Sequence, residues 1–279
     1  MNYKLNRAFT ITELMIAVAM MAVVLAGTGY IFKVAINAQR TANATTEIMR
    51  NLRGITDQLE NDFSGRRTDA PWAVSFDTDS TRRADRIRFV ASGDFQSVRQ
   101  YTASNKTISG NVASICYSQS SDPNVFTGEP RKKILTRRQS IFTVDTSLAS
   151  PAPEPNEYIR QSLTQWEVDF LVARAAAADV NTFYDKWVAR PTINPNNVGD
   201  VNVPLFMARG VDNFTIQISS GVDPNGSGSL LWEPTNQQVI LKQNPSGNPQ
   251  AIKFMFTLYD SKGIIKNGMK FTHIVYLKQ

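Results

Sequence analysis

The pattern of apolar and polar positions changes sharply after Ser64. From Phe9 to Phe32 the only charged residue is Glu13. At 1.5 Å per residue this stretch would form a helix about 36 Å long, enough to cross the hydrocarbon core of a bilayer. A secretory signal peptide is the alternative, but the apolar run is longer than a usual signal core and no clean cleavage pattern closes it. The pattern therefore predicts a membrane-spanning helix over residues 9–32.

The helical pattern continues beyond the apolar run. Apolar residues recur at steps of four, three and four positions, at Ile48, Leu52, Ile55 and Leu59. This spacing places them on one face of an amphipathic helix. A serine followed by glycine at 64–65 is a plausible stop for that helix. We therefore expect residues 33–64 to extend the same helix and to pack an apolar stripe on a globular head.

Beyond Gly65 the period changes from helical spacing to alternation, which is typical of strands. The alternating segments are 87–90, 112–117, 214–218, 252–259 and 271–278. Turn-forming residues separate the last two, so we expect these two to pair antiparallel. The sequence predicts an α+β fold in which a long N-terminal helix packs on an antiparallel β-sheet head formed by residues 65–279.

Two patterns compete in the segment 158–190. Trp166, Val168 and Phe170 alternate as they would in a strand, whereas the alanines and aromatic residues within 175–187 have a helical character. We interpret the segment as a strand that runs into a helical insertion in the head.

The composition limits the chemistry of the chain. Its 279 residues contain 30 Lys and Arg against 24 Asp and Glu, a net charge of +6 that suits a solvated surface as well as an anionic partner. The single cysteine, Cys116, excludes an intrachain disulfide, and its apolar neighbours indicate a buried side chain rather than a nucleophile. The single histidine, His273, argues against a His-based metal site or catalytic triad. We expect no cofactor and no enzymatic activity.

The N-terminal residues Ala8-Phe9-Thr10-Ile11-Thr12-Glu13-Leu14 resemble the class III signal of type IV pilins and type II secretion pseudopilins. In that family a prepilin peptidase removes a short basic leader just before a phenylalanine and methylates the new N-terminus. The family's glutamate is the fifth residue after the cut. The resemblance therefore implies a leader over residues 1–8, cleavage between Ala8 and Phe9, and methylation of Phe9. It also implies that Glu13 acts in assembly, as the family's glutamate does.

Two positions depart from the family pattern. Ala8 stands where glycine is usual, and Tyr30 stands where major pilins commonly have a proline that kinks the helix. Any bend would then fall to Gly27 and Gly29, which loosen a helix without removing a hydrogen-bond donor. A helix without this proline is more similar to minor subunits. The C-terminal strands resemble the heads of J-type minor pseudopilins and W-type minor pilins. The K-type tip subunit commonly lacks the glutamate, so Glu13 argues against that assignment.

The carboxylate of Glu13 needs a physical reason to lie in an apolar span. A charge at the centre of a membrane helix costs on the order of 2.5–3.5 kcal/mol on insertion scales. In a filament Glu13 would pair with the new N-terminal amine of a neighbouring subunit, which offsets the burial of both charges and sets the axial register of the two helices. The alternative is that Glu13 merely reaches the headgroup region, since it lies close to the start of the span.

The resemblance implies a non-catalytic minor subunit that initiates or caps a filament. A J-type minor pseudopilin of type II secretion is favoured over a minor pilin of a type IV pilus or DNA-uptake filament. The expected partners are other minor subunits, the major pilin or pseudopilin, the prepilin peptidase and inner-membrane lipid. Lys4 and Arg7 favour a cytoplasmic N-terminus, which leaves the head in the periplasm. A membrane-anchored periplasmic binding module or enzyme is the alternative from another class.

Two further clusters contain residue types that occur in binding sites. Asp223, Asn225 and Ser227 match the opening of a calcium loop, but Pro234 stands where a bidentate glutamate belongs, which favours a surface turn. The basic residues within 131–138 would suit nucleic acid phosphates or anionic lipid. Because no aromatic residues are interleaved with them, a solvated strand face is favoured and nucleic acid is not an expected partner.

Overall fold

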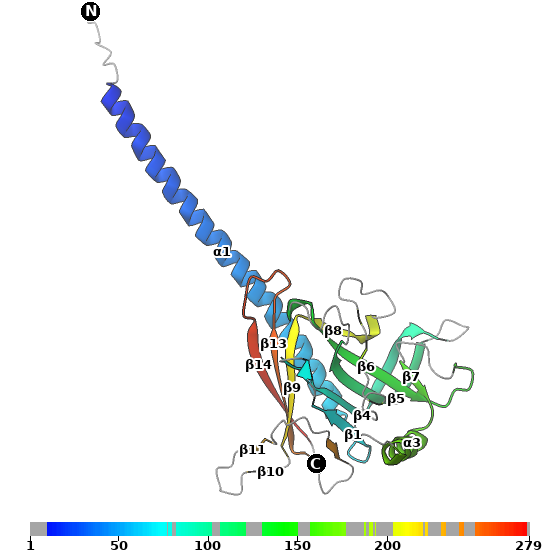
Figure 1. Ribbon diagram of the computed structural model, residues 1–279. Coiled ribbons are helices and arrows are strands. Elements are labelled where there is room, and N and C mark those ends of the chain that lie inside the picture. Colours follow the sequence, from blue (N-terminus) through cyan, green and yellow to red (C-terminus); the bar gives the residue numbers. More distant parts are fainter. Residues whose placement is uncertain are drawn as a thin grey trace, which may run out of the picture.

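The structure is a computed structural model in which α1 (Ile11–Ser64) is the dominant element. It describes residues 10–76, 78–79, 82–101, 107–120, 130–149, 157–176, 187, 190–191, 193, 203–219, 221–222, 230–232, 240–242 and 249–277. Helix α1 is unbroken over 54 residues, including Gly27 and Gly29. Its N-terminal half projects away from the head, and its C-terminal half is embedded in the head (Figure 1).

The head is built mainly from strands, with one further α-helix, α3 (Leu163–Ala176), and two short 3-10 helices, η1 (Pro130–Lys132) and η2 (Val203–Leu205), among the described residues. The strands are β1 (Trp72–Ser75), β2 (Thr78–Asp79), β3 (Arg82–Arg83), β4 (Arg86–Gln100), β5 (Thr107–Gln119), β6 (Ile134–Thr143), β7 (Tyr158–Arg160), β8 (Phe206–Arg209), β9 (Val211–Ser219), β10 (Gly221–Val222), β11 (Leu230–Leu231), β12 (Ile240–Lys242), β13 (Ala251–Leu258) and β14 (Met269–Tyr276).

Two sheets enclose the embedded half of α1. The larger has seven strands, with β12-β1-β4-β5-β6-β7 in order and β8 paired to β6, and the smaller has the order β14-β13-β9. All pairs in both sheets are antiparallel except β6 and β7, which run parallel. The architecture is therefore α+β and pilin-like, as predicted, with one parallel pair that the alternation pattern did not indicate.

The apolar stripe of α1 forms the centre of the head's core. Ile48, Ile55 and Leu59 are fully buried, and Leu52 is partly buried against the same cluster. Phe63 stacks on Phe89 of β4 with ring centroids 4.2 Å apart and also contacts Phe254 of β13 at 5.6 Å. Each such side chain contributes about 1.5–3 kcal/mol on burial. The predicted packing of the helix on the head is confirmed.

The predicted strands are confirmed where the structure describes them. Segments 87–90, 112–117 and 214–218 lie within β4, β5 and β9. Strands β13 and β14 pair antiparallel, with Phe254 opposite His273. Gly263 and Gly268 in the loop between them have φ values of 67° and 62°, which glycine adopts without strain.

The strand prediction at Trp166–Phe170 is wrong, because these residues lie inside α3. Trp166 and Phe170 are four positions apart, so both face the larger sheet and are buried, while Val168 is exposed on the other side. The alternation was therefore accidental, and the i, i+4 aromatic pair was the informative signal. The helical insertion itself is present after β7, although Phe183 and Tyr184 lie outside the described residues.

Candidate functional site

The first turn of α1 contains a capping box that was not predicted from the sequence. The backbone amide of Glu13 donates to Thr10 Oγ1 at 3.3 Å, and the backbone amide of Thr10 donates to Glu13 Oε2 at 2.9 Å. Thr10 Oγ1 also donates to the same carboxylate oxygen at 2.9 Å. The signal was present as threonine followed three positions later by glutamate. Within one chain, Glu13 therefore stabilises the start of the helix.

The predicted cleavage and methylation sites, Ala8 and Phe9, lie outside the described residues. Thr10, the first described residue, has an extended backbone with φ −77° and ψ 151°, so regular helix begins only after it. If the chain is cut before Phe9, the new amine stands one residue before the N-cap and four residues before Glu13 in the sequence.

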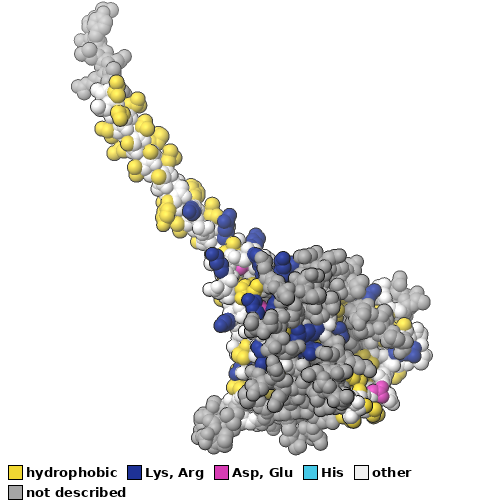
Figure 2. Space-filling model, in the orientation of Figure 1, with side chains coloured by type: hydrophobic (Ala, Val, Ile, Leu, Met, Phe, Trp, Pro, Cys, Tyr) yellow, Lys and Arg dark blue, Asp and Glu magenta, His cyan; other side chains and the backbone are white. Residues whose placement is uncertain are grey.

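The N-terminal half of α1 presents an apolar surface on the face seen in Figure 2. The large apolar side chains from Ile11 to Phe32 are 60–79% exposed, and an 18-residue window of the helix reaches a mean hydropathy of 2.2. The helix is long and apolar enough to cross a membrane. A continuous apolar surface of this extent indicates burial in lipid or against other apolar helices.

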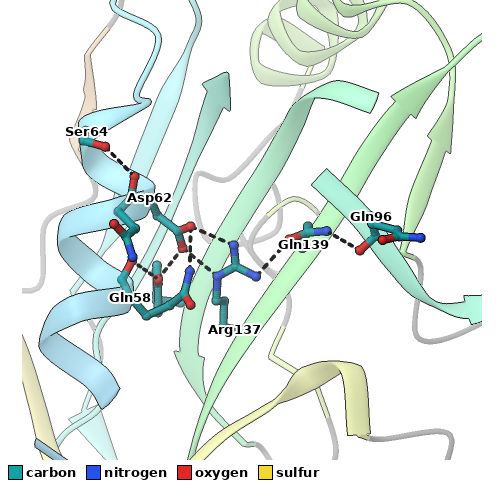
Figure 3. A network of polar contacts seen from close by, with 8 residues as sticks. Gln58, Asp62, Ser64, Gln96, Arg137 and Gln139 are labelled. Atoms are coloured by element: carbon teal, nitrogen blue, oxygen red, sulfur yellow. Dashed lines mark hydrogen bonds and ion pairs between the residues drawn. The ribbon is translucent and has the colours of Figure 1, made fainter. Parts of the chain in front are cut away.

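A buried ion pair joins α1 to the larger sheet. Asp62 is 4% exposed and receives two parallel hydrogen bonds from Arg137 of β6, at 2.6 Å from Nε and 2.7 Å from Nη2. Tyr117 Oη of β5 and Gln58 Nε2 of α1 also donate to this carboxylate, the latter at 3.0 Å. Figure 3 shows the pair as part of a wider polar network that continues to Gln139 and Gln96.

The protonation states around Asp62 strengthen this joint. Burial alone would lower the pKa of Arg137, but hydrogen bonds and charge attraction from Asp62 outweigh it and raise that pKa. Burial and the neighbouring Asp62 charge raise the pKa of Tyr117, so its hydroxyl keeps the proton that it donates. Asp62 lies three positions after Leu59, on the buried stripe, so the sequence held a signal for a buried acid but none for its partner.

The prediction of a solvated strand face for the basic residues within 131–138 is wrong for Lys133 and Arg137. Lys133 is 3% exposed, and its Nζ lies 2.9 Å from Oδ1 of the buried Asp212. Arg82 also donates to Asp212. Lys133 is buried and Arg137 is mostly covered because long-range pairing of β6 places carboxylates from α1 and β9 beside them. Lys132 alone in this group matches the expected exposed cation.

The opposite face of the larger sheet, under α3, holds Cys116. Its thiol is buried, as predicted, and burial raises its pKa, which disfavours the nucleophilic thiolate. The neighbouring Arg88 guanidinium lies 5.3 Å from the ring of Trp166 and 5.9 Å from the ring of Trp187. Burial lowers the pKa of Arg88 to about 10, so it stays charged at neutral pH. These contacts hold α3 on the sheet.

The calcium candidates Asp223, Asn225 and Ser227 lie outside the described residues. Within the part of the chain that the structure describes, no three His, Cys, Asp or Glu side chains gather in a way that suits a metal ion.

Comparison with known proteins identifies the N-terminal segment. A family model described as the prokaryotic N-terminal methylation motif matches residues 3–29. No curated protein and no solved structure matches the chain. The chain thus carries a class III prepilin signal, which implies processing by prepilin peptidase and assembly with other pilin subunits, and the signal continues into a long apolar helix on a pilin-like head.

Proposed function

We propose, for a chain with this prepilin signal and this fold, that it is a non-catalytic minor subunit that initiates or caps a pseudopilus, most closely of the J type in type II secretion. In this proposal residues 1–8 are the removed leader and residues 9–32 span the inner membrane. Residues 33–64 carry the helix into the head, and residues 65–279 form that head in the periplasm.

The observation that carries the proposal is the continuity of α1. One unbroken helix begins at the matched methylation motif, presents an exposed apolar surface, and ends as the core of the head. Packing of the apolar halves of several such helices would therefore set the positions of their heads directly, because no hinge or linker separates the two parts. An enzyme or binding module that needs only an anchor does not require this rigid connection.

Glu13 has two successive roles in this mechanism. In the single subunit its carboxylate accepts hydrogen bonds from Thr10, which reduces the cost of holding a charge in the span. During assembly the same carboxylate pairs with the methylated amine of Phe9 in a neighbouring subunit. Only one axial offset between two helices brings these groups together, so the pair sets the register.

A minor pilin of a type IV pilus or DNA-uptake filament is the second candidate. It shares the signal and the architecture, and the pattern of the C-terminal strands supports both. The two candidates differ in their assembly partners, so crosslinking in cells that contain either a secretion pseudopilus or a type IV pilus separates them.

The test of the proposal is the chemistry of the N-terminus. Mass spectrometry of the protein extracted from membranes should find a mature chain that begins at N-methylated Phe9. A chain that keeps Met1 in cells containing prepilin peptidase would contradict the proposal. Cleavage near Ala26 would identify an ordinary signal peptide, and correct processing with no crosslinks to pilin-like subunits would favour an anchored binding module or enzyme.

A further inference from the structure

Exposed cations surround the point where α1 leaves the head. We name this set the basic collar: Lys33, Arg40, Lys132, Lys262 and Lys266, all exposed. The first two lie on α1, Lys132 ends η1, and the last two lie in the loop between β13 and β14. Figure 2 shows Lys and Arg side chains gathered where the apolar half of the helix meets the head.

Hydrogen bonds fix the loop against the helix. The backbone amide and the hydroxyl of Ser261 donate to the two carboxylate oxygens of Glu47, at 3.0 and 3.1 Å. Arg131 donates to the carbonyl of Lys262 at 3.5 Å, which brings η1 to the same loop. The collar is therefore a defined surface in which cations from three separate elements are held together.

Within the described part of the chain the collar contains few acids, and those acids accept hydrogen bonds from the head itself. From Leu14 to Thr46 α1 has no Asp or Glu. Glu47 is occupied by Ser261, and the buried Asp260 accepts the backbone amides of Ile264 and Ile265, both at 2.8 Å. Among the residues that the structure describes here, five exposed cations thus face two carboxylates that already have hydrogen-bond partners.

The collar lies at the height expected for lipid headgroups. The unbroken run of exposed large apolar side chains along α1 ends at Val34 and Ile36, and the next one is Met49. At 1.5 Å per residue, Arg40 lies about 6 Å beyond Ile36 and Glu47 about 16 Å beyond it. Surface charges interact over a Debye length of about 8–10 Å, and lysine side chains extend this reach.

A notch between the helix and the loop offers a place for a phosphate group. Its volume is about 320 Å³, and its lining combines the cations Arg40 and Lys262 with Asn43, Ala44 and Ile264. The carboxylates of Glu47 and Asp260 also line it, and both already accept hydrogen bonds from the loop. Cations beside a small apolar wall suit a phosphodiester attached to glycerol and acyl chains.

We propose that the basic collar docks the head on anionic phospholipid headgroups, with phosphate in the notch between Arg40 and Lys262. The inference rests on the proposed function, because α1 must first span a membrane. It goes beyond that function by giving the unassembled subunit a lipid-bound resting position, in which the head lies against the membrane until a filament withdraws it. An acidic surface on another subunit is the competing partner, and the experiment separates the two.

The experiment uses the full chain in phosphatidylcholine vesicles with or without phosphatidylglycerol. Asn267 is exposed in the loop, so Asn267→Cys accepts a fluorescent label there, while the buried Cys116 stays unlabelled. Quenching by headgroup-attached quencher lipids reports docking. Quenching should be strong with phosphatidylglycerol, weak without it, and lost in about 1 M salt, where the Debye length is about 3 Å.

A matched pair of double variants tests the residues. Arg40→Gln with Lys262→Gln removes two collar charges. Arg67→Gln with Lys253→Gln also removes two charges. Arg67 lies just beyond the C-terminal end of α1, and Lys253 lies near the N-terminal end of β13, away from the collar. Each cation near an anionic surface contributes roughly fivefold, so the collar variant should lower the ratio of docked to undocked heads about 25-fold. The control variant should leave that ratio unchanged.

Four outcomes would overturn the inference. Docking that ignores phosphatidylglycerol, or an equal loss in both variants, removes the role of the collar. A collar variant that loses crosslinks to partner subunits without any change in lipid docking assigns the surface to an acidic protein. Resistance to alkaline extraction is measured in parallel: a chain that fails to insert contradicts the proposed function, whereas an inserted chain whose head stays undocked contradicts only this inference.

Discussion

The two halves of α1 are one continuous helix held by different surroundings. From Ile11 to Phe32 the large apolar side chains are exposed on all sides of the helix. From Ala44 to Phe63 only one stripe is apolar, and that stripe is buried between two sheets. The first half needs an apolar solvent or other helices to cover it, whereas the second half is covered by its own chain.

This difference indicates how a subunit can be both assembled and stable. The embedded half carries interactions that work within one molecule, including the stripe and the Asp62–Arg137 pair. The projecting half carries groups that are incomplete within one molecule, namely the exposed apolar surface and Glu13. Changes in the projecting half should therefore affect assembly, and changes in the embedded half should affect folding of the head.

The largest expected effect comes from removing each half in turn. Deleting residues 1–32 should give a soluble, folded head, because the buried stripe remains. Deleting residues 1–64 should cause aggregation, because the loss of Ile48, Ile55, Leu59 and Phe63 leaves the apolar faces of both sheets uncovered. Size-exclusion chromatography and circular dichroism measure the outcome. Two equally well-behaved proteins would show that the helix does not stabilise the head.

The next largest effect is expected at the joint between helix and sheet. Asp62→Ala leaves the largely covered Arg137 guanidinium without its carboxylate, and breaking a buried pair costs about 3–5 kcal/mol of unfolding free energy. Glu60→Ala is the matched control on the same helix. Its carboxylate is 65% exposed and lies 3.6 Å from His273, so its loss should cost under about 1 kcal/mol. Urea denaturation of the head measures both, and similar losses would mean that the buried pair contributes little.

At Glu13 the comparison is between assembly and local capping. Glu13→Gln keeps a side chain that can complete the capping box but loses the charge, so it should impair assembly mildly. Glu13→Ala leaves a partner's amine unpaired, and Glu13→Lys adds a like charge, so lysine should be worst. The measurements are crosslinking between co-expressed subunits and denaturation of the head, which should stay unchanged. If Glu13→Lys assembled as well as the unchanged chain, only the explanation that Glu13 reaches the headgroup region would remain.

The smallest effect is expected at the helix start. Thr10→Ala removes the cap and should destabilise the first turn by about 1 kcal/mol, which speeds exchange of its amide hydrogens about fivefold. Thr28→Ala is the control, because Thr28 Oγ1 donates to the carbonyl of Val24 within the helix and caps nothing. Hydrogen exchange followed by mass spectrometry distinguishes them, and an unchanged first turn in Thr10→Ala would show that the capping box is dispensable.

Local patterns were enough to predict the parts of this protein that depend on near neighbours in sequence. The apolar run, the stripe from Ile48 to Leu59 and the final strand pair all repeat with the period of their element, so each was visible without the fold. The signal around Glu13 was likewise readable, because its residues are contiguous. The capping box is equally local, because its threonine and glutamate stand three positions apart.

Tertiary structure decided the features that join distant residues. Asp62 and Arg137 are separated by 75 positions, and Lys133 meets Asp212 only because strands from different parts of the chain are brought together. The sequence of the basic cluster within 131–138 therefore predicted a solvated face, because it does not show which carboxylates lie beside the cluster in the fold. Likewise Trp166 and Phe170 lie in a helix rather than a strand, because the helix turns both side chains toward the sheet that buries them. Periodicity records which face a residue occupies, but the partner on that face is chosen by long-range packing.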